Sequence, residues 1–392
     1  MKVYLDYAAT KPVKKEVFEA MESYFKQEFG NPSSIHSFGR KARQAVDESR
    51  ATIANFLGAK NSEIIFTASG SESDNLAIKG VIGAVKISKP HIITSQIEHH
   101  AVSKTCEALE KNGVAVTYLK PNVEGIIEPE KIKKAIQPNT VLVSIMYVNN
   151  EIGTIQGVRE IGKLIEKENK NRKQRIYFHT DAVQATEFLP MNVDFLHIDM
   201  LTIAGHKIGA PKGIGLLYVR EGTPIIPMVH GGEQERGMRA GTENVAYIVG
   251  LAKAIELIQN SELKIKNVKK LRNYFIEKIQ KKISEVHLNG SKENRTPNNA
   301  NLYFKYIEGE SIVLSLDLEG VACSTGSACT SQSLEPSHVI MAVYSDPFRA
   351  AGSVRFSLGE QTTRQELDFA IKKIKEMVAR LRKISPYNKE SK

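Results

Sequence analysis

The chain has few cysteines and no long apolar run. Only Cys106, Cys323 and Cys329 occur among its 392 residues, and no Cys-x-x-Cys is present. Such a sparse, odd set argues against a disulfide framework and cannot form a four-cysteine zinc site, so we expect no metal. No apolar stretch approaches the roughly 20 residues of a membrane helix, and no signal-peptide core follows the first residues. We therefore expect a cytoplasmic protein with no membrane partner.

Size and charge set further bounds. The chain is too long for one small core, so two domains are expected. Its net charge is +10, but many lysines fall at helical spacing in residues 263–283 and near the C-terminus, interleaved with Glu and Asn. We interpret this charge as a solvated helix face and expect no nucleic-acid partner. A nucleic-acid patch and a modest preference for anionic partners or substrates are the alternatives.

Strand and helix patterns alternate through the first two thirds of the chain. Apolar segments typical of buried strands lie at residues 63–67, 91–95, 115–119, 141–148, 176–180, 195–201 and 214–219. Helical patterns lie at residues 14–29, 40–57, 72–85, 100–111, 129–136 and 158–169. This alternation predicts an α/β fold with a mostly parallel sheet covered by helices on both faces.

The pattern changes after residue 242. A long helical pattern at 242–284 is followed by shorter strands and helices, which indicate a smaller α+β domain. We expect residues 14–258 to form the large domain, and residues 1–13 and 259–392 to form the small one.

Lys207 lies between Gly205 and Gly209, directly before an apolar strand. A lysine held this way can bond to a carbonyl cofactor, provided that burial lowers its pKa. A surface lysine in a turn is the alternative.

Two predicted strands end in candidate ligand-binding residues, one set suited to binding an anion and the other to binding a cation. Residues 66–75 pass from a strand through a Ser/Gly turn into a helix, a natural anion site with Ser71 as a hydroxyl donor. The alternative there is a plain capping box. Asp181 ends another strand, and a protonated pyridine nitrogen would offset its burial, with Gln184 near a ring oxygen. An ordinary helix-capping aspartate is equally compatible.

His99 and Asn150 also follow predicted strands. His99 could stack on a flat cofactor and transfer protons, or it could be a structural histidine at a helix start. His100 is expected in solvent. Asn150 is a candidate for orienting a ligand, although turn chemistry explains Asn-Asn equally well.

Two candidates belong to the second domain. Cys329 lies in a loop of small residues, Ser324-Thr-Gly-Ser-Ala-Cys-Thr-Ser331, where a thiol can become a thiolate nucleophile. Cys323 is expected to be a buried small hydrophobe. Arg355, in the middle of an apolar strand, needs a carboxylate, either from a substrate or from an internal salt bridge.

Together these motifs resemble the cysteine desulfurases of the NifS/IscS type, pyridoxal-phosphate enzymes of the class V aminotransferase family with fold type I. The resemblance runs over nearly the whole chain. It is carried by Tyr4-Leu-Asp-Tyr-Ala-Ala-Thr10, Gly30-Asn-Pro-Ser-Ser34, Glu72-Ser-Asp-Asn75, Glu98-His99, Val148-Asn-Asn-Glu-Ile-Gly153, Asp181-Ala-Val-Gln184, Gly205-His-Lys207, residues 230–242, residues 324–331 and Arg355-Phe-Ser-Leu-Gly359.

The resemblance implies a role for each candidate. Lys207 is similar to the lysine that bonds the cofactor aldehyde and moves the substrate's protons, and Cys329 to the cysteine that forms a persulfide. The other implied roles are the pyridine partner Asp181, the ring-oxygen partner Gln184, the stacking acid–base His99, the phosphate cradle Gly70, Ser71 and His206, the substrate pair Asn150 and Arg355, and Thr242, which reaches the phosphate from a second subunit. A homodimer is therefore expected.

Two positions depart from the family pattern. Ala204 stands where Ser or Thr is usual, so one phosphate hydroxyl is absent, and Ser71 replaces a common Thr. We expect cofactor binding to survive, weakened by about 1 kcal/mol for each lost hydrogen bond.

The resemblance implies conversion of L-cysteine to L-alanine, with the sulfur passing through Cys329 to an iron–sulfur scaffold or another acceptor protein. A selenocysteine lyase or aminotransferase of the same fold is an alternative. A basic binding protein without activity is a second one.

Overall fold

The computed structural model describes residues 1–259, 261–326 and 336–386. Its largest sheet has seven strands in the order β2-β8-β7-β6-β5-β3-β4. Neighbours from β7 to β4 are parallel, whereas β8 is antiparallel to both β7 and β2. The strands are β2 (Ile64–Thr67), β3 (His91–Ser95), β4 (Ala115–Leu119), β5 (Thr140–Ser144), β6 (Tyr177–Asp181), β7 (Met200–Ala204) and β8 (Gly215–Val219). The predicted mostly parallel sheet is confirmed.

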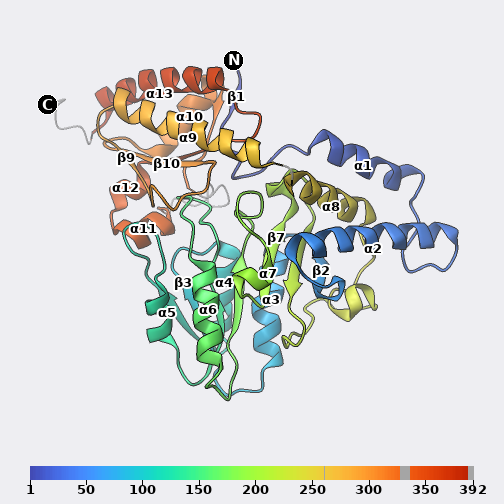
Figure 1. Cartoon of the computed structure of the whole chain (residues 1–392). Coiled ribbons are helices and arrows are strands. Elements are labelled where there is room, and N and C mark those ends of the chain that lie inside the picture. Colours follow the sequence, from blue (N-terminus) through green and yellow to red (C-terminus); the bar gives the residue numbers. More distant parts are fainter. Residues whose placement is uncertain (260, 327–335, 387–392) are drawn as a thin grey trace.

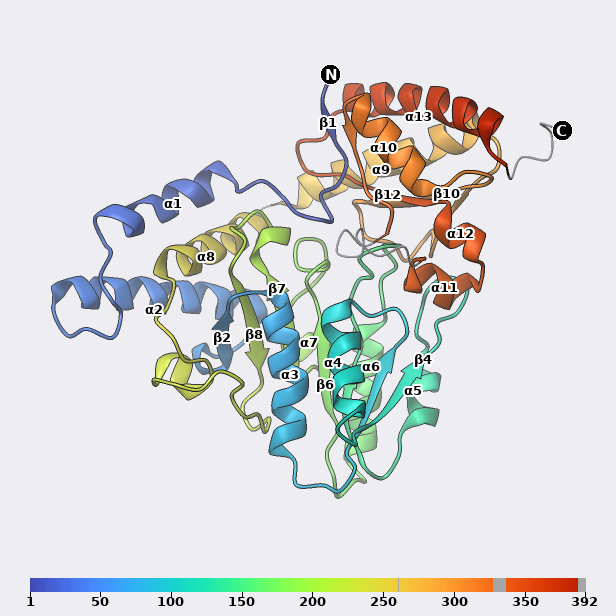
Figure 2. The ribbon, with the colours of Figure 1, turned by 180° about the vertical axis from the view of Figure 1, so that it is seen from behind.

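Helices cover both faces of this sheet (Figures 1 and 2). Side chains alternate between the faces, so Phe66 packs in one apolar core and its neighbour Ile65 in another. The core of Ile65 is closed by α3 (Gly70–Ala84) and α4 (His100–Glu110). The core of Phe66 includes side chains of α1 (Lys15–Lys26), α2 (Ser37–Leu57), α5 (Pro129–Ala135), α6 (Val158–Asn169), α7 (Val193–Leu196) and α8 (Val245–Gln259).

A smaller antiparallel sheet, β12-β10-β9, lies at the other end of the molecule (Figure 1). Its core has Phe275 and Phe356 with ring centroids 5.1 Å apart. The elements here are α9 (Glu262–Lys282), β9 (Val286–Leu288), β10 (Asn299–Phe304), α10 (Gly309–Leu318), β11 (Val321–Ala322), α11 (His338–Tyr344), α12 (Pro347–Ala351), β12 (Ser353–Ser357) and α13 (Arg364–Ile384). The N-terminal strand β1 (Val3–Tyr4) pairs with β11, so the first residues join this second core. The exact domain boundaries, after residues 13 and 258, remain a prediction.

Some predicted elements are wrong in detail. Residues 195–201 are not one strand, because the turn of helix α7, capped by the Asn192 side chain, precedes β7. The helical pattern at 242–284 contains two helices, α8 and α9. The strand predicted at 141–148 ends at Ser144, and the short helices α11 and α12 were not predicted. No helix among the described residues is long and apolar enough to cross a membrane.

Candidate active site

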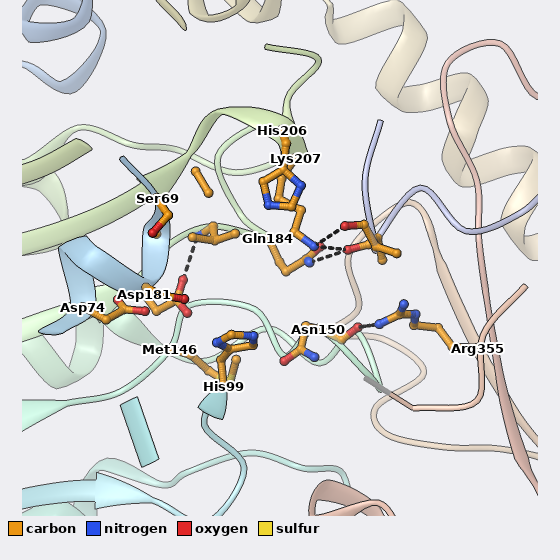
Figure 3. Close-up of a pocket in the computed structure, with 16 residues that line it drawn as sticks. Ser69, Asp74, His99, Met146, Asn150, Asp181, Gln184, His206, Lys207 and Arg355 are labelled. Carbon is orange, nitrogen blue, oxygen red and sulfur yellow. Dashed lines mark hydrogen bonds between the residues drawn. The ribbon is translucent and has the colours of Figure 1, made fainter. Parts of the chain in front are cut away.

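A cavity of about 190 Å³ opens where the strands of the large sheet end and the second sheet begins (Figure 3). Nine of the site residues predicted from the sequence line it together, as do Ser69, Asp74, Met146 and Ala204, the position that departs from the family pattern. The nine are Gly70, Ser71, His99, Asn150, Asp181, Gln184, His206, Lys207 and Arg355. Because parallel strands place their carboxyl ends at one edge, residues far apart in sequence meet here.

Lys207 ends the short helical turn η2 (Gly205–Lys207), which follows β7. Its Nζ donates hydrogen bonds to the carbonyl oxygens of Ala8 at 2.6 Å and Ala9 at 2.7 Å, as Figure 3 shows. Gln184 Nε2 also donates to the Ala8 carbonyl, at 3.0 Å. The N-terminal segment therefore fixes the lysine amine, a contact that the sequence reasoning missed.

His206 stands beside Lys207 in the same turn. Burial, with a further contribution from the charge of Lys207, lowers the pKa of His206 to about 4. The ring is therefore neutral near pH 7, and its Nδ1 lies 3.3 Å from the hydroxyl of Thr10. A neutral imidazole at this place can donate a hydrogen bond to an anion without adding a full charge.

Two buried carboxylates face the cavity. Asp181, at the end of β6, accepts the Val183 N–H at 2.9 Å, and burial raises its pKa, opposed by the nearby charges of His99 and Lys207. Asp74 on α3 has an Oδ1 atom with no hydrogen-bond partner among the described residues. Burial, and then the charge of Asp181, raise the pKa of Asp74 well above its usual value. A cationic ring nitrogen at this place would offset both effects, so these acids fit pyridoxal phosphate.

His99 combines the two predicted alternatives. It caps α4, with Nδ1 accepting the Ala101 N–H at 3.1 Å. Its ring also projects into the cavity (Figure 3). The prediction that His100 lies in solvent is wrong: its ring centroid is 4.7 Å from that of His338, and its Nδ1 is buried.

The N-terminus of α3 forms another side of the cavity. Ser69 caps this helix by accepting the Glu72 N–H at 3.1 Å, but Glu72 accepts the N–H of Ala68, at 2.9 Å, and not that of Ser69. Only the Ser69 half of the capping box considered from the sequence is therefore present. Gly70 is close-packed: a Cβ there would lie 3.2 Å from the Cβ of Ala204. The positive end of the helix dipole fits a phosphate, although Ala204 offers no hydroxyl.

Arg355 reaches the cavity from β12 in the smaller sheet, and its side chain is 2% exposed. Its Nη1 donates to the Asn150 carbonyl at 2.8 Å, and its Nη2 donates to Asp6 Oδ1 at 3.0 Å. The internal salt bridge considered from the sequence therefore exists. Asp6 belongs to the motif Tyr4-Leu-Asp-Tyr-Ala-Ala-Thr10, but its local spacing gives no sign of this contact with Arg355.

The remaining candidates are Thr242 and Cys329. Thr242 lines a different cavity, together with Phe66, Gly213 and Arg239. Cys329 lies outside the described residues, within the stretch 327–335 of the sequence. Cys323 is buried, as predicted.

Comparison with known proteins agrees with this geometry. The aminotransferase class-V family model matches residues 3–369. The cysteine desulfurase IscS of Dictyoglomus turgidum is 53% identical over 389 residues, covering 99% of this chain and 97% of the relative. The cysteine desulfurase IscS of Methanosarcina thermophila is 50% identical over 386 residues, covering 98% and 94%.

Solved structures show the same fold. A NifS-like protein superposes with a TM-score of 0.91 at 35% identity, covering 97% of this chain and 100% of that chain. A structure described as SspA in complex with cysteine has a TM-score of 0.81 at 39% identity, covering 93% and 100%. From nearly full-length similarity, a shared fold and a cavity that fits the cofactor, we conclude that the chain belongs to the aminotransferase class-V family and, within it, to the pyridoxal-phosphate-dependent cysteine desulfurases.

Proposed function

We propose that the chain removes sulfur from free L-cysteine, releases L-alanine, and holds the sulfur as a persulfide on Cys329. The observation that supports this most strongly is the shared cavity of Lys207, Asp181 and Arg355. This cavity brings together the amine of Lys207, the buried carboxyl group of Asp181 and the guanidinium of Arg355, which is suited to binding an α-carboxylate. When bound, pyridoxal phosphate supplies an aldehyde for amines and a ring that withdraws electrons from the substrate α-carbon.

The protein groups divide the remaining work. Asp181 would hold the pyridine nitrogen, Gln184 would hold the ring oxygen, and His99 would stack on the ring. The α3 N-terminus at Gly70 and Ser71, with His206, would hold the phosphate. Arg355 and Asn150 would orient the substrate carboxylate, and Lys207 would take and return protons at the substrate carbons.

Sulfur transfer is assigned to Cys329. A bond forms between its thiolate and the substrate sulfur, while the substrate Cβ–S bond breaks. The carbon fragment keeps that electron pair and is protonated to alanine. The persulfide then passes its outer sulfur to an acceptor, for which we propose an iron–sulfur scaffold or another acceptor protein in the cytoplasm.

We further propose a homodimer in which Thr242 serves the phosphate of the partner's site. Two observations support it. Thr242 lines a cavity other than that of Lys207. Large apolar side chains are exposed on α1, on the next loop and at the start of α2, namely Phe18, Phe25, Phe29, Ile35 and Phe38. A solution mass of one chain would contradict the dimer.

The central experiment compares the parent enzyme with Cys329→Ser. L-cysteine should change the cofactor absorption of both proteins, because Lys207 and Arg355 are intact. Only the parent should release alanine and sulfide in the presence of a reductant. Normal alanine formation by Cys329→Ser would refute the role of Cys329. Strict dependence on a keto acid would instead favour an aminotransferase.

A further inference from the structure

Arg355 has an anionic partner within the protein itself. The guanidinium is almost completely buried, and Asp6 is the one carboxylate that pairs with it among the residues described. Arg355 lines the active-site cavity, whereas Asp6 is absent from the lining. Asp6 therefore binds the arginine from outside the cavity and neutralises a charge that the substrate carboxylate is expected to use.

Asp6 is itself held in place. Its second oxygen, Oδ2, accepts the hydroxyl of Ser324 at 2.8 Å. Ser324 and Arg355 also exchange backbone hydrogen bonds, of 3.2 Å from Ser324 N and 2.7 Å from Arg355 N. Ser324, Arg355 and Asp6 thus form one fixed unit, in which Asp6 cannot turn away without losing two hydrogen bonds.

When an amino acid binds, its α-carboxylate and the carboxylate of Asp6 both lie next to the Arg355 guanidinium. Arg355 has five N–H donors, of which one is used by Asp6 and one by the Asn150 carbonyl, while Nε has no partner among the described residues. Donors therefore remain for a ligand, but the ligand's charge must be placed near that of Asp6. Like charges repel more strongly at a buried site than in water.

We propose that Asp6 is a resident counter-ion of Arg355 that lowers the affinity of the site for the α-carboxylate of amino acids. It acts through Arg355 and is a specificity-determining, positioning residue rather than a catalytic one. The proposal rests on the proposed role of Arg355 in carboxylate binding. The consequence is easier release of the alanine product, because product and substrate carry the same carboxylate.

The test uses Asp6→Asn in the pyridoxal-phosphate-loaded enzyme. Asparagine keeps the size of the side chain and an oxygen that can accept the Arg355 N–H, but removes the charge. Binding is measured from the change in cofactor absorption with two ligands, L-alanine and ethylamine. They differ by the carboxylate alone, and neither contains sulfur, so Cys329 does not affect the result.

L-alanine should bind Asp6→Asn at least about fivefold more tightly than the parent, whereas the affinity for ethylamine should stay within about twofold. An unchanged or weaker affinity for L-alanine would overturn the proposal. Equal tightening for both ligands would also overturn it, because that result indicates a general change in the cavity.

Ser324→Ala provides a second test that does not require Asp6→Asn to fold. Without the Ser324 hydroxyl, more of the Asp6 charge acts on Arg355, so L-alanine should bind about twofold more weakly. Ser324→Thr, which keeps the hydroxyl, is the matched control. Tighter or unchanged binding in Ser324→Ala would contradict the proposal.

Arg355→Ala separates this inference from the proposed function. If the parent and Arg355→Ala bind L-alanine equally, the assignment of Arg355 fails, and with it the proposed function of this site. If Arg355→Ala binds L-alanine poorly while Asp6→Asn equals the parent, the inference about Asp6 alone fails.

Discussion

Replacing Glu98 with glutamine should stabilise the protein at high pH. Glu98 is fully buried, and its Oε1 accepts the Ser95 hydroxyl at 2.6 Å and the Met146 N–H at 3.1 Å. Burial raises its pKa from 4.5 to about 8, although these hydrogen bonds partly oppose the shift. The folded chain therefore holds a proton on Glu98 that the unfolded chain releases above pH 4.5.

The sign of the effect follows from this difference. Because the folded pKa is raised, the stability that Glu98 contributes is complete below about pH 4.5 and is lost as pH rises through about 8. At 1.36 kcal/mol per pKa unit, the loss between roughly pH 5 and pH 9 is on the order of 4 kcal/mol. Glutamine does not titrate, keeps an oxygen for the same donors, and should not lose this stability.

The assay is chemical denaturation of both proteins at several pH values, with cofactor at saturation. The stability of Glu98→Gln relative to the parent should increase steadily between about pH 5 and pH 9. Glu107→Gln, which changes a half-exposed glutamate on α4, is the matched control and should show little trend. If the relative stability of Glu98→Gln is flat or falls with pH, the reasoning about its buried proton is wrong.

Two further substitutions test the phosphate site and a buried ion pair. Ala204→Ser should lower the Kd of pyridoxal phosphate for the apoenzyme about fivefold, since one hydrogen bond is worth about 1 kcal/mol; equal or weaker binding in a fluorescence titration would contradict the fit. Arg50→Ala should lower the free energy of unfolding by about 3–5 kcal/mol. Glu235 accepts hydrogen bonds from both Nη atoms of Arg50 and is 2% exposed, so the substitution leaves a buried carboxylate without its cation. Thermal unfolding measures this loss, with Lys15→Ala in an exposed pair as the control; equal losses would show that burial of the Arg50 pair is unimportant.

Much of the cavity could be predicted because the topology of a parallel sheet is simple. Asp181 and Asn150 follow strands whose carboxyl ends lie at one edge, so their convergence follows once the strands are recognised. The roles given to them remain predictions. Lys207 belongs to the same edge, because β7 ends just before it.

The contacts that the sequence did not reveal join distant segments. Asp6 and Arg355 are 349 residues apart, and no local pattern relates them. The carbonyl oxygens of Ala8 and Ala9 bind Lys207 through the backbone, so side-chain chemistry gives no signal of that contact. The proposed role of Thr242 involves a second subunit, and within one chain Thr242 lines a cavity other than that of Lys207.

The secondary-structure errors have local physical causes. Residues 195–201 are apolar enough for a buried strand, but the Asn192 side chain caps a helical turn at the start of this run. His197 then ends the turn in the left-handed conformation, at φ 55°. Hydrophobic pattern alone cannot distinguish a short buried turn from a strand of similar length.

The pairing of β1 with β11 has a consequence for synthesis and folding. Val3 lies opposite Val321, so the first strand has no partner until most of the chain has left the ribosome. The segment that follows β1 carries the Ala8 and Ala9 carbonyls to the Lys207 amine. Because β1 is made long before β11, this segment is expected to be among the last to reach its native position, as for other contacts of high sequence separation. Until this segment is in place, the active site lacks the wall that holds the Lys207 amine.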